Sequence, residues 1–317
     1  MKKIIRLLVL CILAFSFAHI QAEEKTIGIG FQKGSGLLSI LKSQGTLEKI
    51  LATKAVKVKW VEFPAGPQLL EALHAGSIDF GLTGAPPPIF AQSAGVDLRY
   101  VGAEPSAPAS EAIVVRKQST LNKVTDLKGK KIAFQKGSSS HFLILDVLQK
   151  FGLSMSDIQP VYLTPADARA AFVSGSIDAW VIWDPYLVAV QQTLQVRVIA
   201  DHRGLTPVNS FYEASKTLTE KSPEILNVLL EQLALIGAWS NQHPREVATI
   251  IAPQLGLPAE ILEVWLHRTQ YGVLPMNKEI IFHQQHIADL FFQAKLIPKA
   301  VNVAAATWVW KPVPSGK

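Results

Sequence analysis

Two turns in this 317-residue sequence combine hydroxyl side chains with glycine, a pattern that suits the binding of a small anion. One is Gly137–His141 (GSSSH), which leads into a helical stretch, and the other is Thr83-Gly84. Backbone N–H groups at the start of a helix can bond an oxyanion, and the helix dipole adds positive potential there. Serines at such a place also cap helices, so each turn predicts either an anion-binding cradle or a plain strand-to-helix joint.

A third segment could supply the apolar part of the same site. Trp183 lies at the end of an expected strand and is followed by Asp184 and Pro185. The tryptophan would either form a wall for a ligand tail or belong to the core. The aspartate either caps the next helix, repels a wrongly placed anion or favours an amine. Glu104 is the other carboxylate that a cationic ligand group could use.

Two short sequences occur twice, about a hundred residues apart. FQKGS is found at 31–35 and 134–138, and GSID at 76–79 and 175–178. Each FQKGS lies between an apolar run and a helical stretch, which is where open α/β sheets bind ligands. Each GSID precedes a strand and is expected to be structural. The repeats indicate two similar halves that each hold one side of a ligand.

Strand-like and helix-like segments alternate over the first two thirds of the chain, which indicates crossover connections and a mostly parallel sheet. A first helix is expected over 37–51. After about residue 202 the pattern is helical, apart from one short strand expected near Phe211. The expected strands are 26–31, 56–63, 79–82, 97–101, 112–115, 131–134, 161–163, 179–182 and 197–200, and the later helices are 223–239, 244–252, 258–267 and 278–295.

A chain of this length favours two domains, and the late helices need a sheet to cover. The simplest topology returns them to the first half of the chain. We therefore expect a first lobe of residues 23–108 plus 204–317 and a second lobe of residues 109–203. Two crossings, near 104–111 and 201–208, would form a hinge about which the lobes rotate.

Residues 1–22 have the layout of a secretory signal peptide, with a basic start, a short apolar run and Ala22 at the end. Their removal leaves 295 residues without cysteine, because the single cysteine is Cys11, and lowers the formal net charge from +6 to +3. That small charge, without basic runs, argues against nucleic acid as a partner. No later apolar run has the length of a membrane span, so we expect a soluble periplasmic protein.

Patterns of enzymes and metal sites are incomplete. Gly28 and Gly30 suggest a dinucleotide loop, but Gly34 falls one position late for it. His283 and His286 lack the glutamate of the zinc-protease motif, so a solvated helix face is favoured. We expect no catalytic residue, no cofactor and no metal. A secreted α/β enzyme is the less favoured alternative.

Longer stretches carry a resemblance to a known family. They are 60–81 (WVEFPAGPQLLEALHAGSIDFG), 87–95 (PPIFAQSAG), 126–141 (DLKGKKIAFQKGSSSH), 157–172 (DIQPVYLTPADARAAF), 178–186 (DAWVIWDPY) and 288–303 (ADLFFQAKLIPKAVNV). With them the sequence resembles the periplasmic aliphatic sulfonate-binding proteins of ABC importers, in a wider group that includes taurine, nitrate and thiamine-precursor binders. The resemblance implies a type II periplasmic binding protein fold, with two doubly wound lobes and a double-crossing hinge.

The resemblance also implies a ligand and a partner. It implies capture of an aliphatic sulfonate and delivery to the membrane subunits of an ABC permease for sulfur acquisition. Taurine, nitrate or a thiamine precursor is the alternative ligand, and we expect a monomer. Ala85 stands where the family often has aspartate, so the ligand range would differ. The candidate ligand-binding residues are Gln32, Thr83, Gly84, Gly137, Ser138, Ser139, Ser140, His141, Trp183 and Asp184.

Overall fold

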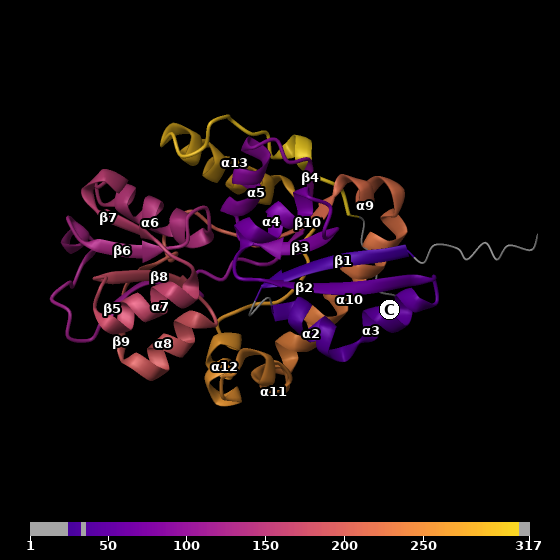
Figure 1. Ribbon diagram of the computed structural model, residues 1–317, viewed down its shortest axis with the longest axis horizontal. Coiled ribbons are helices and arrows are strands. Elements are labelled where there is room, and N and C mark those ends of the chain that lie inside the picture. Colours follow the sequence, from indigo (N-terminus) through magenta and orange to yellow (C-terminus); the bar gives the residue numbers. More distant parts are fainter. Residues whose placement is uncertain (1–24, 33–35, 311–317) are drawn as a thin grey trace, which may run out of the picture.

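The structure is a computed structural model that describes residues 25–32 and 36–310 (Figure 1). The expected signal peptide with Cys11, and residues 33–35 of the first FQKGS, lie outside the described residues. The described chain is a mixed α/β protein with two five-stranded sheets. The elements of the second sheet occupy the left of Figure 1 and those of the first sheet the right.

The first sheet has the strand order β2-β1-β3-β10-β4. Strand β1 pairs in parallel with β2 and β3, whereas β10 runs antiparallel to both β3 and β4. The strands are β1 (Lys25–Gln32), β2 (Val56–Phe63), β3 (Phe80–Thr83), β4 (Leu98–Ala103) and β10 (Phe211–Ser215).

The second sheet repeats this arrangement with the order β7-β6-β8-β5-β9. Strand β6 pairs in parallel with β7 and β8, and β5 runs antiparallel to β8 and β9. The strands are β5 (Glu111–Arg116), β6 (Lys131–Phe134), β7 (Gln159–Tyr162), β8 (Ala179–Trp183) and β9 (Val196–Asp201).

The direction of β5 and β10 follows from the two crossings. The chain leaves the first sheet at the carboxyl end of β4 and enters the second as β5, and it returns from β9 as β10. A strand that enters at the edge where parallel strands end must run against them, so one antiparallel strand per sheet marks each crossing. We call the first sheet with α2–α5 and α9–α13 the first lobe, and the second sheet with α6–α8 the second lobe. The lobe limits that the sequence predicts within the crossing segments stay a prediction.

Helices cover both faces of the first sheet. Ile27, Ile29 and Phe31 of β1 pack into one core with α2, α3 and α10, while Gly28 and Gly30 face the side of α4. A Cβ atom on Gly28 would lie 2.8 Å from Ile78 Cα, so only glycine permits this close packing. The helices of this lobe are α2 (Gly36–Gln44), α3 (Thr46–Ala52), α4 (Gly66–His74), α5 (Pro86–Ser93), α9 (Lys216–Lys221), α10 (Pro223–Gln242), α11 (Pro244–Leu255), α12 (Ala259–Leu266) and α13 (Lys278–Gln293).

The second sheet is covered in the same way. Residues of α6 pack on the face that carries Ile113 and Val181, and residues of α7 and α8 pack on the face that carries Val114 and Trp180. The helices are α6 (Ser139–Lys150), α7 (Pro165–Ser174) and α8 (Tyr186–Leu194). None of the helices in the described part of the chain has the length and apolar character that a bilayer crossing requires.

Two local features bear on the sequence predictions. The helix expected over 37–51 is two helices, because Gly45 adopts a left-handed conformation (φ 62°) between α2 and α3. The repeated GSID does the same work in both lobes: Asp79 accepts a hydrogen bond from Gly28 N, and Asp178 accepts one from Lys131 N, each at 2.8 Å. Each aspartate therefore ties a loop to a neighbouring strand.

Candidate functional site

A cavity of about 180 Å³ lies between the two lobes. Residues of both lobes and of both crossings line it. Seven of the ten candidate ligand-binding residues are among them: Gln32, Thr83, Gly84, Ser138, Ser139, Trp183 and Asp184.

The two hydroxyl-bearing turns both line this cavity and approach each other closely. A Cβ atom built on Gly84 would lie 3.1 Å from Ser139 Cβ and 3.4 Å from Ser139 Oγ. The two residues belong to different lobes and are far apart in sequence. We call Thr83-Gly84 and Ser138–Ser140 the facing turns. A small group in the cavity beside this contact would touch both lobes at once.

Helix starts converge on the cavity. Its lining includes Gly36 at the start of α2, Gly66 at the start of α4, Pro87 in the first turn of α5 and Ser139 at the start of α6. Each start carries the positive end of a helix dipole. Within the described residues, the backbone N–H groups of Gly84, Ser139 and Ser140 have no hydrogen-bond acceptor. The cavity therefore offers donors and positive potential to an anion.

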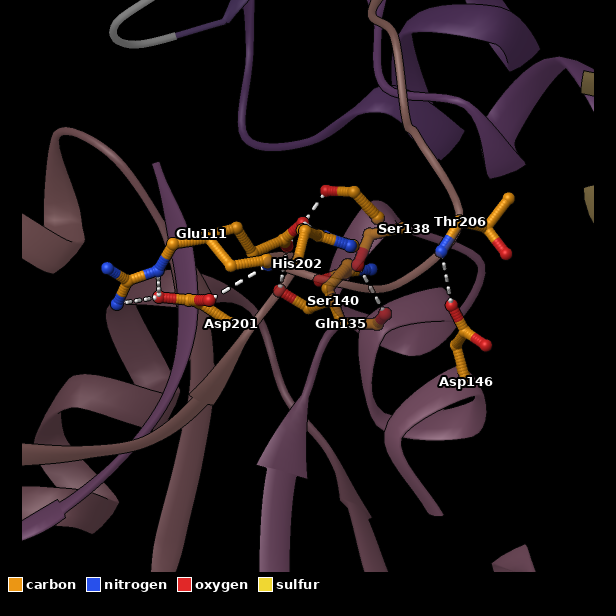
Figure 2. Close-up of polar contacts among 10 residues, drawn as sticks. Glu111, Gln135, Ser138, Ser140, Asp146, Asp201, His202 and Thr206 are labelled. Carbon is orange, nitrogen blue, oxygen red and sulfur yellow. Dashed lines mark hydrogen bonds and ion pairs between the residues drawn. The ribbon is translucent and has the colours of Figure 1, made fainter. Parts of the chain in front are cut away.

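The hydroxyl groups of the facing turns are already used as donors. Ser138 Oγ donates to Gln135 O at 2.7 Å. Ser139 Oγ and Ser140 Oγ both donate to Glu111 Oε1, at 2.9 and 2.6 Å. A hydroxyl has one proton to give, so in this arrangement an anion would be bound through backbone N–H groups rather than through these serines. Figure 2 shows Ser138 and Ser140 with their partners.

Each facing turn has a buried carboxylate behind it. Thr83 Oγ1 donates to Glu213 Oε1 at 2.6 Å, and burial raises the pKa of Glu213 well above its usual value. In the second lobe Glu111 accepts from the two serines and pairs with His202, with 2.9 Å between Glu111 Oε2 and His202 Nε2 (Figure 2). These carboxylates fix the rotamers of the hydroxyl side chains and so shape both walls.

The structure places three candidate residues away from the cavity lining. Ser140 is fully buried beside Glu111, and His141 is fully buried and stacks on Phe134 with ring centroids 5.2 Å apart. Burial, with a smaller effect of Lys136, lowers the pKa of His141 to about 4, so its ring is neutral. Gly137 has a φ of 74° and donates its N–H to His141 Nδ1. These side chains support the turn from behind, although the N–H of Ser140 still has no acceptor within the described residues.

An ion pair joins the lobes beside the cavity. Arg268, just after α12 of the first lobe, pairs with Asp184 of the second through Nε–Oδ2 at 2.9 Å and Nη2–Oδ1 at 3.1 Å. Arg268 Nη1 also donates to Gln191 Oε1 of α8. Asp184 Oδ1 accepts from Val188 N as well. Burial raises the pKa of Asp184 to about 7, and Arg268 opposes that rise.

Several lining residues were not among the candidates. They include Glu111, His202, Trp265 and Tyr271, together with Glu104, which the sequence marked only for a cationic ligand. Trp265 and Tyr271 come from the helical part after residue 202, whose local pattern gives no sign that it reaches the cavity. Among the described residues, no group of three or more His, Cys, Asp or Glu side chains could hold a metal ion.

Comparison with known proteins gives consistent results. The NMT1/THI5-like family matches residues 52–246. The chain is 45% identical over 311 residues to the putative aliphatic sulfonates-binding protein of Escherichia coli (strain K12), which covers 97% of each chain. Among solved structures it is similar to the alkanesulfonate-binding protein SsuA of Xanthomonas axonopodis pv. citri bound to MOPS, with a TM-score of 0.85 and 43% identity over 89% of this chain and 98% of that one.

Other relatives are more distant. The taurine-binding periplasmic protein of Escherichia coli (strain K12) is 27% identical over 215 residues, 67% of this chain and 66% of that protein. The desulfurization enzyme DszB has a TM-score of 0.64 at 15% identity over 89% of this chain and 96% of that one, a likeness that shows the fold alone. The aliphatic sulfonates-binding protein and the alkanesulfonate-binding protein named above, at 45% and 43% identity, are both binding proteins.

Proposed function

The chain belongs to the NMT1/THI5-like family and, within it, to the aliphatic sulfonate-binding proteins, and from this membership we propose that it captures aliphatic sulfonates in the cavity between its lobes. The observation that carries the proposal is the pair of facing turns, whose backbone donors come from both lobes. The protein would act as a binding protein and not as an enzyme.

The chemistry of a sulfonate suits this site. The group is a permanent anion with three acceptor oxygens and takes up no proton near neutral pH. Neutral N–H donors at helix starts can satisfy such an anion without a buried cation. The donors at Gly84, Ser139 and Ser140 would take the sulfonate oxygens. A binding protein must also release its ligand, and several modest hydrogen bonds suit that task better than one buried ion pair.

The remainder of the cavity suits an alkyl chain. Trp183, Trp265 and Tyr271 line it, together with Leu82 and Val208. Burial of a methylene group contributes about 0.8 kcal/mol, so chain length would modulate affinity. Trp183 is only partly buried and packs edge-on against Tyr186, with ring centroids 6.3 Å apart. It would serve as one wall for the chain.

We place the mature protein in the periplasm and its partner in the membrane. The periplasmic names of the relatives and the leader-like first 22 residues support export. The expected partner is the membrane subunits of an ABC permease, to which the loaded protein would deliver its ligand as a monomer. Closure of the two lobes about the crossings would mark the loaded state.

Thermal unfolding with a panel of ligands tests the proposed function. Butanesulfonate or 3-aminopropanesulfonate is expected to raise the melting temperature, because a ligand at 100 times its Kd stabilises the folded state by about 2.7 kcal/mol. Nitrate, sulfate and an aminopyrimidine are expected to have little effect. Stabilisation by nitrate or the pyrimidine, with none by any sulfonate, would contradict the proposal.

A further inference from the structure

One carboxylate in the cavity has a free oxygen and no cationic partner. Glu104 lines the cavity at the first crossing, and its Oε1 accepts a hydrogen bond from Tyr212 Oη at 2.8 Å. Within the described residues, its Oε2 has no donor, and no lysine, arginine or histidine lies within ion-pair distance of it. The other lining carboxylates differ, because Asp184 pairs with Arg268 and Glu111 with His202.

The backbone holds Glu104 in place. Glu104 N donates to Ser210 O at 2.8 Å, and Asn209 Nδ2 donates to Glu104 O at 2.8 Å. Both crossings therefore fix its position at the edge of the first sheet. Burial raises the pKa of Glu104 to about 7, and Tyr212 opposes the rise. A carboxylate that is held in a cavity and desolvated in this way gains from a ligand that brings a positive charge.

A second polar group in the cavity lining also has no hydrogen-bond partner among the described residues. Tyr271 lines the cavity, is only 5% exposed, and its hydroxyl group has no hydrogen-bond partner among the described residues. Glu104, Asp184 and Tyr271 all line this cavity, and burial, followed by the negative charges of Glu104 and Asp184, raises the pKa of Tyr271. A phenol oxygen can accept a hydrogen bond from an ammonium group. Trp183 and Trp265 in the same lining offer aromatic faces, which also attract cations.

The spacing from the facing turns fits a short ligand with two charges. Phe211 of β10 pairs with Thr83 of β3 on one side and with Ala103 of β4 on the other. The backbones at Thr83 and Ala103 are therefore two strand spacings apart, roughly 10 Å. A sulfonate at the facing turns and an ammonium group at Glu104 would be separated by less than this, because a hydrogen bond of about 2.8 Å at each end of the ligand takes up part of the distance.

We propose that Glu104 and Tyr271 form a subsite for a positively charged amine, so that the preferred ligands are aliphatic sulfonates that carry an ammonium group at the far end of a short chain. This inference rests on the proposed function and specifies its substrate class. The sulfonate end lies at the N–H groups of the facing turns and the ammonium end at the crossing. The net charge of such a ligand is zero, which matches a cavity with helix starts at one place and an unpaired carboxylate at another.

Calorimetry with a matched pair of ligands tests the subsite. Butanesulfonate and 3-aminopropanesulfonate have nearly the same shape, and a methyl group in one replaces the ammonium group in the other. At pH 8.5, where Glu104 is ionised, the wild-type protein is expected to bind the ammonium ligand at least tenfold more tightly. Glu104→Gln keeps the side-chain shape and removes the charge. This variant is expected to bind 3-aminopropanesulfonate at least tenfold more weakly than the wild type does. It is expected to bind butanesulfonate two- to fivefold more tightly, because a negative charge near the anion has been removed.

Two further variants separate charge from fold. Glu71→Gln makes the same change on an exposed residue of α4 and is expected to leave the ratio of the two affinities unchanged. Tyr271→Phe removes only the hydroxyl group. It is expected to lower the affinity for 3-aminopropanesulfonate severalfold more than the affinity for butanesulfonate. If the ratio of the two affinities is the same in the wild type, Glu104→Gln and Tyr271→Phe, the ammonium subsite is wrong, while the proposed function still holds. A wild-type protein that binds neither ligand would overturn the proposed function as well.

Discussion

Replacing Gly84 by valine is expected to weaken butanesulfonate binding by 100-fold or more, about 2.7 kcal/mol. A Cβ atom at this position already lies 3.1 Å from Ser139 Cβ, which is tighter than ordinary packing, and the γ-methyl groups of valine reach further. The facing turns would have to separate, and the N–H donors of the two lobes could no longer contact one sulfonate. Calorimetric titration measures the loss.

The fold of this variant should survive. The φ of Gly84 is not in the left-handed region, so the backbone there accepts other residues, and we expect the melting temperature of the ligand-free protein to change by less than about 3 °C. Gly84→Ala should give an intermediate loss. Gly272→Ala is the control, because its new Cβ atom would meet only Pro105, at 3.8 Å. Wild-type affinity in Gly84→Val would show that the facing turns do not bind the ligand together.

The second large effect concerns stability. Replacing Arg268 by methionine is expected to lower the free energy of unfolding by about 3–5 kcal/mol at pH 8.5, because it leaves Asp184 buried without its partner. The same variant should give a larger radius of gyration in the ligand-free state, since Arg268 is bonded to Asp184 and Gln191 across the lobes. Chemical denaturation and small-angle scattering measure the two effects.

The loss of stability in Arg268→Met should increase with pH. Burial raises the pKa of Asp184 from 3.8 to about 7 in the folded state. Protonation of Asp184 therefore stabilises the folded state. This contribution is fully present below pH 3.8, the pKa in the unfolded state, and is lost as the pH rises through 7. Without Arg268 the folded-state pKa rises further, so near pH 6 the carboxyl group is neutral in the variant and the loss is small. Above pH 7 the loss grows.

Matched variants test the cause. Arg203→Met breaks an ion pair with Asp201 in which the arginine is 71% exposed, and it should lower the free energy of unfolding far less than Arg268→Met does. Asp184→Asn in the Arg268→Met background removes the buried charge and should restore much of the stability. Equal losses for Arg268→Met and Arg203→Met, at all pH values, would mean that the pair between the lobes contributes little.

Much of the architecture could be predicted from the sequence, because most strands and helices follow from the local pattern of apolar residues, glycine and proline. The apolar runs bounded by glycine and proline predicted nine strands close to their observed limits. After residue 202 the predicted short strand near Phe211 is β10, and the helices that follow it were also predicted. The break between α2 and α3 was missed, because helical spacing continues across Gly45 and only its left-handed backbone interrupts the helix. The short helix α9 was also missed, because it follows β10 directly and has little periodicity.

The site was predicted less completely, for a physical reason. Spacing identified both turns, since glycine and hydroxyl residues after a strand are a local signal. It could not show that the hydroxyl groups are occupied by Glu213 and Glu111, because the partners lie 130 and about 30 residues away. For the same reason it could not bring Arg268 to Asp184. Which groups act as donors to a ligand is decided by these long-range contacts.

The most direct test of the account is an amide NMR titration of the mature protein with butanesulfonate. We expect the largest changes at the backbone N–H groups of Gly84, Ser139 and Ser140, shifted downfield and saturating with one common Kd. Shifts confined to one of the two lobes, or largest at residues away from the cavity, would contradict the claim that donors from both lobes bind a single sulfonate.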